Sequence, residues 1–301
     1  MTEWALHSTP PLRGVLREQV RAVGLALRGP AAALGALAAL ATALVLSDIV
    51  RNSQAVDFHP ERWVLAGVAG LLLPAAVWKG EERFGAAFLW TLPVDRRGHT
   101  LARAFAGWAW LMAGVAAFVL WLLALALVSG GSVGVKETLL TIPSFPLPGP
   151  GPIDAATVRP VQWTPARVLW LVPFTAATAT YLLSTAVTLG VRHPLRWIAA
   201  IVLAGFLVAT VSEAADAEGA AELPEKVLSL LVAGRYGLET VLIASTESLK
   251  IDTTLSTGER AMVWRGLPDP GQWAMATLIW TAAGLAALWA AASRHGERRR
   301  R

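Results

Sequence analysis

The sequence contains no cysteine, and it has only two tyrosines and four methionines among its 301 residues. Without cysteine, the chain has no disulfide, no thiolate metal ligand and no cysteine nucleophile. Charged residues make up 16% of the chain, whereas a soluble domain averages about 25%. The sequence therefore lacks both thiol chemistry and the polar surface of an ordinary soluble domain.

Phosphate-binding and metalloprotease signatures are also missing, because no G-x-x-x-x-G-K-[ST] and no H-E-x-x-H occurs. A G-x-S-x-G is present at Gly130–Gly134. It follows an apolar run and opens a proline-rich stretch, whereas a nucleophile elbow joins a strand to a helix. We interpret it as a flexible loop. The five histidines are far apart in sequence and show no metal-ligand spacing, so we expect no catalytic residue and no metal in this chain.

What the chain has in abundance is apolar sequence. Hydrophobic residues account for 55% of it, and the mean hydropathy is +0.52. Fourteen tryptophans stand against two tyrosines, and tryptophan is enriched at membrane interfaces. The net charge of +5 comes largely from basic residues beside apolar runs, which is typical of membrane topology and gives no reason to expect nucleic acid as a partner. These features predict an integral membrane protein.

Six apolar segments are candidate membrane spans. They cover about 30–46, 63–78, 104–128, 168–189, 197–211 and 273–292. The second, at about 16 residues, is short for a hydrocarbon core of roughly 30 Å. We predict an all-α protein of six transmembrane helices that forms a single domain over residues 1–301.

Residues 1–29 precede the first span and carry two helical stripes. One stripe is apolar and the other is basic: Leu12, Leu16, Val20, Val23 and Leu27, and Arg13, Arg17, Arg21 and Arg28. The pattern predicts an amphipathic helix that lies in the membrane interface next to anionic lipid. The alternative is a basic lead-in that only sets topology.

Two long polar segments separate the later spans. Residues 129–164 are rich in proline and are expected to be extended, either as an external cap on a transport path or as a plain linker. Residues 212–271 carry more acids than bases and include an apolar-periodic stretch from 223 to 244. We expect this segment to form short helices outside the membrane. A basic tail, 293–301, follows the last span and is expected to be a cytoplasmic anchor.

The charged segment 79–103 lies between the second and third spans. Lys79, Glu81, Glu82 and Arg83 open it, and Pro93 interrupts it. Because the residue before a proline avoids the α region, a first helix should end near residue 92. Asp95 can then cap a second helix that continues into the third span. The segment is predicted to be a helix–break–helix elbow whose charged face is offered to a soluble partner.

Basic residues are concentrated in the N-terminal segment, the elbow, the short turn after the fourth span and the tail. By the positive-inside rule these pieces are cytoplasmic, so both termini are predicted to lie inside and the two long polar segments outside.

The fourth span carries hydroxyl groups on one helical face. They belong to Thr178, Tyr181, Thr185 and Thr188, with Ser184 nearby. Such groups line a polar translocation path in one interpretation. In the other they bond to carbonyls one turn earlier or across helices, and serve packing alone.

The elbow resembles that of ABC type-2 family permeases, in which a segment of roughly L-x-L-P-V-S-R-R follows the second span and docks on the ATP-binding subunit. The corresponding residues here read Leu92-Pro93-Val94-Asp95-Arg96-Arg97. Asp95 replaces the usual serine and keeps the capping role. The hydropathy layout is similar over the whole chain.

This resemblance implies the permease subunit of a bacterial ABC exporter in the cytoplasmic (inner) membrane. It implies a pair of permeases, made of two copies or of two homologues, and separate ATP-binding subunits that hold ATP and Mg²⁺. The implied interface with the ATPase consists of Glu81, Glu82, Arg83, Phe88, Trp90, Pro93, Asp95, Arg96 and Arg97. The alternative function is that of a membrane-embedded enzyme, anchor or assembly factor that uses the acidic segment 212–271.

Overall fold

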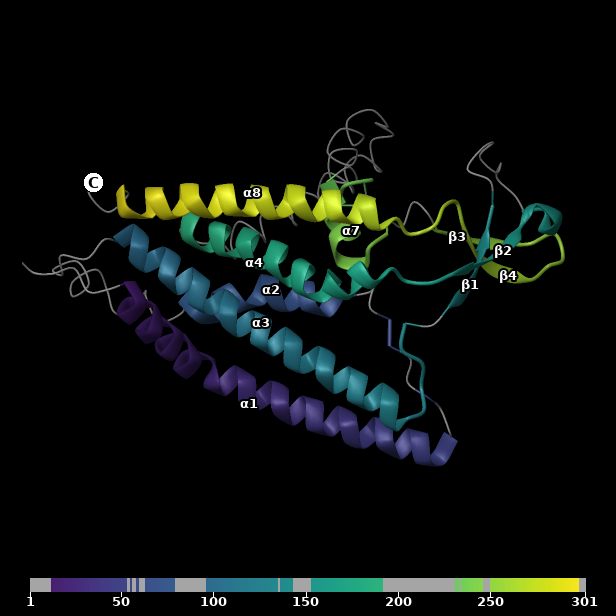
Figure 1. Ribbon diagram of the computed structural model, residues 1–301, viewed down its shortest axis with the longest axis horizontal. Coiled ribbons are helices and arrows are strands. Elements are labelled where there is room, and N and C mark those ends of the chain that lie inside the picture. The colour runs from purple at the N-terminus through teal and green to yellow at the C-terminus, as the bar shows by residue number, and fades with distance from the viewer. Residues whose placement is uncertain are drawn as a thin grey trace, which may run out of the picture.

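The computed structural model describes residues 12–52, 55, 58–59, 63–78, 96–134, 136–142, 153–191, 231–232, 234–245 and 250–297. Over these residues the chain is mostly helical, and a small sheet lies beyond one end of the helical bundle (Figure 1). The long helices are α1 (Leu12–Asn52), α2 (Val64–Trp78), α3 (Arg96–Val128), α4 (Val172–Gly190) and α8 (Pro270–Glu297). Shorter helical pieces are η1 (Ala155–Thr157), η2 (Arg167–Leu171) and α7 (Leu238–Ile243).

Four described helical stretches are long and apolar enough to cross a membrane, namely Gly14–Ile49, Arg97–Val128, Arg167–Gly190 and Pro270–Ser293. The apolar helix α2 is shorter, with 15 residues. Its place matches the second predicted span, and the fifth predicted span, 197–211, lies outside the described residues. The composition of these helices indicates that the chain associates with a membrane. Of the six predicted spans, four are confirmed as helices of membrane length.

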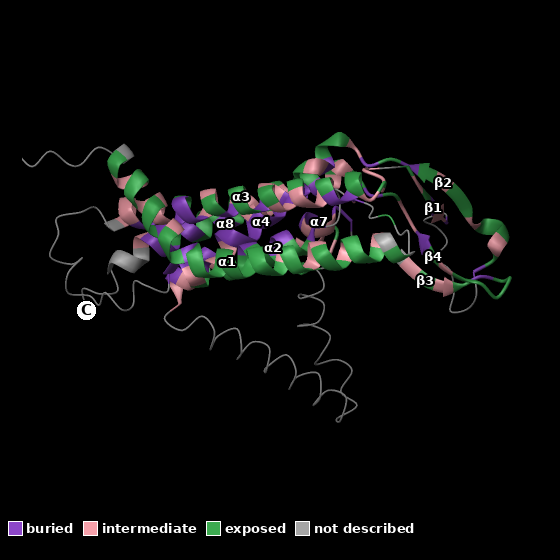
Figure 2. Ribbon diagram, turned by 90° about the horizontal axis from the view of Figure 1, so that it is seen from below, coloured by how far each residue is buried: buried purple, intermediate pink, exposed green. Residues whose placement is uncertain are grey.

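Helix α4 is the centre of the bundle. It packs against α2, α3, α7 and α8. More than half of the residues in the most apolar part of Arg167–Gly190 are buried, whereas none of those in the most apolar part of α1 are (Figure 2). Its buried residues include the small Ala176, Ala177 and Ala179, which lie beside the larger Tyr181 and Leu182. Small side chains let helix backbones approach closely, which is how helices associate in a membrane without a hydrophobic driving force.

Helix α1 is one continuous helix of 41 residues, roughly 60 Å long. The predicted interfacial helix and the predicted first span are therefore parts of the same element, with Pro30 inside it. Figure 1 shows that α1 bends along its length, as a proline that removes one backbone hydrogen bond would cause. The apolar stripe does not face lipid: Val23 and Leu27 are buried in one cluster with Val77 and Trp78 of α2.

The four-stranded sheet corrects the all-α prediction. Its strands are β1 (Glu137–Thr141), β2 (Arg159–Trp163), β3 (Lys250–Thr254) and β4 (Arg260–Trp264), in the order β2-β1-β4-β3. Strands β1 and β2 form one antiparallel hairpin and β3 and β4 another. The hairpins join through a parallel β1–β4 contact, in which Leu140 lies opposite Val263 and Thr141 opposite Trp264.

The sheet unites the two predicted external segments. The segment 129–164, which the prolines predicted to be extended, supplies β1, η1 and β2. The segment 212–271, in which the apolar period predicted a helix over 223–244, supplies β3 and β4. Ile142 and Ile153 from the first segment form a small core with Leu255 and Val263 from the second. Each hairpin alone would leave these side chains exposed, so the two segments fold against each other.

The two ends of the helical bundle are formed by different segments of the chain. The start of α1, the start of α3 and the end of α8 lie at one end, and the sheet lies at the other (Figure 1). The described parts of the segments predicted to be inside therefore lie at the end of the bundle opposite the sheet, which belongs to the segments predicted to be outside.

The approach of α2 to α4 depends on Gly70. A Cβ at this position would overlap with Oγ1 of Thr180 and with the carbonyl oxygen of Ala177. We expect Gly70→Val to lower the free energy of unfolding by about 1–3 kcal/mol, since overpacking forces backbones apart. Thermal unfolding of the purified protein in detergent would measure the change. The matched control is Gly114→Val on α3, where nothing lies within 4 Å; an equal loss there would contradict this explanation.

Sidedness can be tested with single cysteines, because the chain has none of its own. Thr257 lies in the turn between β3 and β4, and Glu18 lies near the start of α1; both are exposed. A membrane-impermeant maleimide added to intact cells is expected to label Thr257→Cys and to spare Glu18→Cys until the cells are permeabilised. Labelling of Glu18→Cys alone would invert the topology, and labelling of both would contradict placing the two ends on opposite sides.

Candidate functional site

The predicted elbow is described only at its two flanks. Seven of the nine predicted interface residues lie outside the described residues: Glu81, Glu82, Arg83, Phe88, Trp90, Pro93 and Asp95. Arg96 is the first residue of α3, and the structure describes its backbone alone. The flanks of the elbow, which are the last turn of α2 and the first turns of α3, therefore define the candidate site.

Arg103 joins these two flanks. Its Nε and one terminal nitrogen donate to the carbonyl oxygen of Val77 over 3.2 and 2.6 Å. The last carbonyls of a helix lack partners within the helix and carry partial negative charge, so a guanidinium is well suited to them. The same guanidinium lies 5.4 Å from the ring centroid of Trp78. The end of α2 is thus fixed to α3 directly before the elbow begins.

Arg97 joins the start of α3 to α8. Its guanidinium carbon lies 3.3 Å from the ring centroid of Trp289, within the range in which a cation is attracted to the face of an aromatic ring. The sequence predicted that Arg97 contacts the ATPase. The structure gives it a partner within the chain, Trp289 of the last helix, at the start of α3.

Helix α1 is attached at the same end. The side-chain amide of Gln19 donates to Nε2 of His99 over 2.9 Å, so the third contact also involves the first turn of α3. We call this set the polar clamp; it comprises Gln19, the Val77 carbonyl, Arg97, His99, Arg103 and Trp289. The clamp connects α1, α2 and α8 to the first two turns of α3.

The hydroxyl face of α4 packs against other helices in the described structure. Oγ1 of Thr178 accepts from Nε1 of Trp108 over 3.1 Å. The hydroxyl of Tyr181 donates to the carbonyl oxygen of Ala104 over 2.8 Å, and that of Ser184 donates to the carbonyl oxygen of Leu71 over 2.6 Å. These three hydrogen bonds attach α4 to α2 and α3.

The other members of this face bond locally or are enclosed. Thr188 donates to the carbonyl oxygen of Ser184 over 2.8 Å, one turn earlier, and Thr178 donates to that of Phe174 over 2.7 Å. Thr185 is completely buried, one turn from Tyr181. The packing interpretation of these hydroxyls accounts for the contacts seen, while a translocation path along them stays a prediction that would require them to exchange partners.

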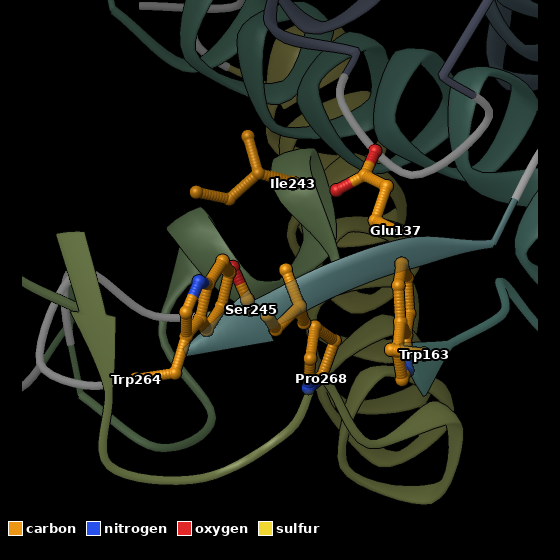
Figure 3. A pocket seen from close by; sticks show the side chains of 7 residues that line it. Glu137, Trp163, Ile243, Ser245, Trp264 and Pro268 are labelled. Carbon is orange, nitrogen blue, oxygen red and sulfur yellow. The ribbon is translucent and has the colours of Figure 1, made fainter. Parts of the chain in front are cut away.

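A small cavity lies where the sheet meets the helices. It is lined by Glu137 and Leu139 of β1, Trp163 of β2, Ile243 and Ser245 at the end of α7, Trp264 of β4, and Pro268 (Figure 3). Its volume of about 10 Å³ is enough for about one water molecule. Glu137 is paired with Nδ1 of His59 over 2.7 Å. The cavity is therefore a packing feature of the junction and is too small for a substrate.

The described acids of segment 212–271 are spread over separate elements. Asp252 and Glu259 are exposed on the β3–β4 hairpin. Asp269 accepts from the backbone nitrogen of Gly271 over 2.8 Å at the start of α8, which satisfies one of the free donors of the helix. Within the described ranges, no three His, Asp or Glu side chains come together to hold a metal ion.

Sequence reasoning missed Gln19, His99, Arg103 and Trp289 as members of the clamp. The only available signal was weak: each of them is a polar or interfacial residue that the positive-inside pattern places near the cytoplasmic ends of predicted spans. Which of these residues touch one another depends on the packing of helices that are far apart in sequence.

Removing the guanidinium of Arg103 should weaken the clamp. Arg103→Met keeps the length of the side chain but leaves the Val77 carbonyl without its two donors, so we expect a loss of about 1.5–3 kcal/mol in the free energy of unfolding. Chemical denaturation of the purified protein would measure the difference. Arg260→Met, at an exposed position in β4, is the control. Equal stability of the two variants would show that the Arg103 contact contributes nothing.

No family model, no curated protein and no solved structure matches this chain. The likeness of the elbow to that of ABC type-2 permeases stays a prediction from the sequence.

Proposed function

We propose that this chain is the membrane-spanning permease subunit of an ABC exporter, driven by a separate ATP-binding subunit that docks on the elbow 79–103. The observation that carries the proposal is the polar clamp. Both flanks of the elbow are bonded, through Arg103 on one side and Arg97 on the other, to helices of the bundle. A docking segment transmits force only if its ends are fixed to the parts that must move.

The clamp distributes such a force over several helices. A displacement of the elbow would act on α2 through the Val77 carbonyl, on α8 through Trp289 and on α1 through the Gln19–His99 contact. Helices α2 and α8 both pack against the central helix α4. Closure of an ATPase pair could thereby turn the bundle as a rigid body, which is a usual form of switching between inward- and outward-open states.

The sequence also supports an external source of energy. It has no phosphate-binding loop of its own, so ATP and Mg²⁺ belong to the proposed partner. The proposed assembly contains two permeases, as two copies or two homologues, in the bacterial cytoplasmic membrane. The sheet at the opposite end of the bundle is then the external part of the subunit.

The alternative functions receive no specific support from the described residues. A membrane enzyme that uses the acids of segment 212–271 would need them gathered, whereas the described ones lie on α7, on the β3–β4 hairpin and at the start of α8. An anchor without transport activity would need no mechanical connection between its docking segment and four helices.

A test begins with purification of the full chain from its native membrane and identification of the proteins that accompany it. We expect an ATP-binding cassette subunit. Arg96→Glu combined with Arg97→Glu should reduce its recovery by about tenfold or more, since like charges would replace complementary ones at the interface. The control is Arg159→Glu with Arg260→Glu, at exposed positions in the sheet. The absence of any ATPase from the wild-type preparation would refute the proposal.

Trp289→Leu separates the two roles of Arg97. This change removes the cation–π stack and leaves both arginines of the elbow in place. Recovery of the ATPase is expected to stay at the wild-type level, while ATP-driven movement of α8 relative to α4 should decline. Spin labels on single cysteines in the two helices would report that movement. If Trp289→Leu also loses the ATPase, docking depends on the contact between Arg97 and Trp289. Arg97 would then act only through the clamp and would not contact the ATPase itself.

A further inference from the structure

Three arginines of α1 form one exposed stripe. Arg17, Arg21 and Arg28 are four and seven residues apart, so they project within about 40° of one another around the helix axis. All three are exposed. Among the residues that the structure describes, no carboxylate forms an ion pair with any of them. Three like charges along one face are unfavourable unless an anion is near.

The stripe runs beside the contact between α1 and α3. At this contact the indole nitrogen of Trp110 donates to the carbonyl oxygen of Val20 over 2.9 Å. The indole ring lies against Gly24, where an added Cβ would come within 2.8 Å of Cζ2. Trp110 remains 43% exposed, so an apolar ring surface adjoins the row of guanidinium groups. Tryptophan with an anchored N–H and an exposed ring is typical of the headgroup level of a bilayer.

The position of the stripe along α1 also fits the headgroup level. Beyond Pro30 the outer face of α1 is apolar and exposed, with Leu34, Leu37 and Leu40 at 66%, 61% and 58% exposure, as expected for contact with acyl chains. Arg28 directly precedes this apolar part. Arg21 and Arg17 lie about 10 and 16 Å further along the axis, across the headgroup layer and into the adjoining water.

We infer that Arg17, Arg21 and Arg28, together with the exposed ring of Trp110, bind the headgroup of an anionic phospholipid. The guanidinium groups match phosphate oxygens in charge and in hydrogen-bonding geometry. The ring of Trp110 and the arginine stems provide the apolar surface against which the first part of an acyl chain can lie. Val23 and Leu27 of the apolar stripe are buried in one cluster with residues of α2 and α3, so the basic face of α1 is the one available to lipid.

This inference requires only that the chain is embedded in a membrane. It is independent of the proposed transport function, and its test needs neither an ATPase nor a transported substrate. Failure to bind anionic lipid would leave the transport proposal as it stands, and failure of the transport proposal would leave the lipid site as it stands.

The test uses the purified full chain in a neutral detergent that contains equal amounts of phosphatidylglycerol and phosphatidylcholine. Native mass spectrometry counts the molecules of each lipid that stay bound. We expect the wild-type protein to prefer phosphatidylglycerol. Each basic residue near an anionic surface contributes a factor of about five, so Arg17→Gln, Arg21→Gln and Arg28→Gln combined should reduce this preference by at least about tenfold.

The matched control removes three other exposed arginines, by Arg159→Gln, Arg167→Gln and Arg260→Gln combined. It changes the net charge by the same amount and should keep the wild-type preference. An equal reduction in both triple variants would overturn the inference, because it would show an effect of net charge alone. No preference in the wild-type protein would also overturn it, and would favour an acidic protein surface as the partner of the stripe.

Two further measurements keep the inference testable if the triple glutamine variant fails to fold. Replacement of the same three arginines by lysine keeps the charges and should keep most of the preference; a loss as large as that of the glutamine variant would overturn the inference. In the wild-type protein, an increase of NaCl from about 50 mM to about 500 mM should release phosphatidylglycerol selectively, because salt screens exposed charges. Retention unaffected by salt would overturn the inference as well.

Discussion

The close approach of α2 and α3 to α4 is the contact on which the rest of the structure depends. At Gly70 there is no room for a Cβ between α2 and Thr180 of α4, and at Gly107 the hydroxyl of Tyr181 occupies the place that a Cβ would take. At this separation the polar side chains of α4 reach the backbone carbonyls of their neighbours. A wider spacing would leave those hydroxyl groups without partners in an apolar environment, so close packing and hydrogen bonding depend on each other.

The sequence predicted the helices well and the sheet not at all, for one physical reason. A long apolar run marks a membrane helix through local information alone, and the predicted spans 104–128, 168–189 and 273–292 lie within α3, within η2 and α4, and within α8. Strands of five residues carry little pattern, and β1 pairs with β4 over more than a hundred residues of sequence. The prolines of segment 129–164 predicted an extended chain, but they could not indicate a partner strand for β1 or β2.

The candidate site, like the fold, could be predicted from the sequence only in part. Its position between the second and third spans and the charge of Arg96 and Arg97 were readable from the sequence. The stacking of Arg97 on Trp289 could not be predicted from the sequence, because Arg97 lies at the start of α3 and Trp289 towards the end of α8. The two residues meet only through the packing of α3 and α8 around α4. The amphipathic pattern of residues 12–28 was also ambiguous in one respect. It identified an apolar and a basic face, but neighbouring helices, and not lipid, cover the apolar one.

Helices α3 and α8 are connected at both ends of the bundle. At one end Arg97 stacks on Trp289. At the other, α3 leads into β1 and β4 leads into α8, and these two strands are paired in parallel. A rotation of α8 alone would break the stack and displace the strand pairing at the same time. A rotation that carries both helices together preserves both contacts. These two connections favour a motion in which α3 and α8 move together, and the elbow at the start of α3 is attached to the same pair of helices.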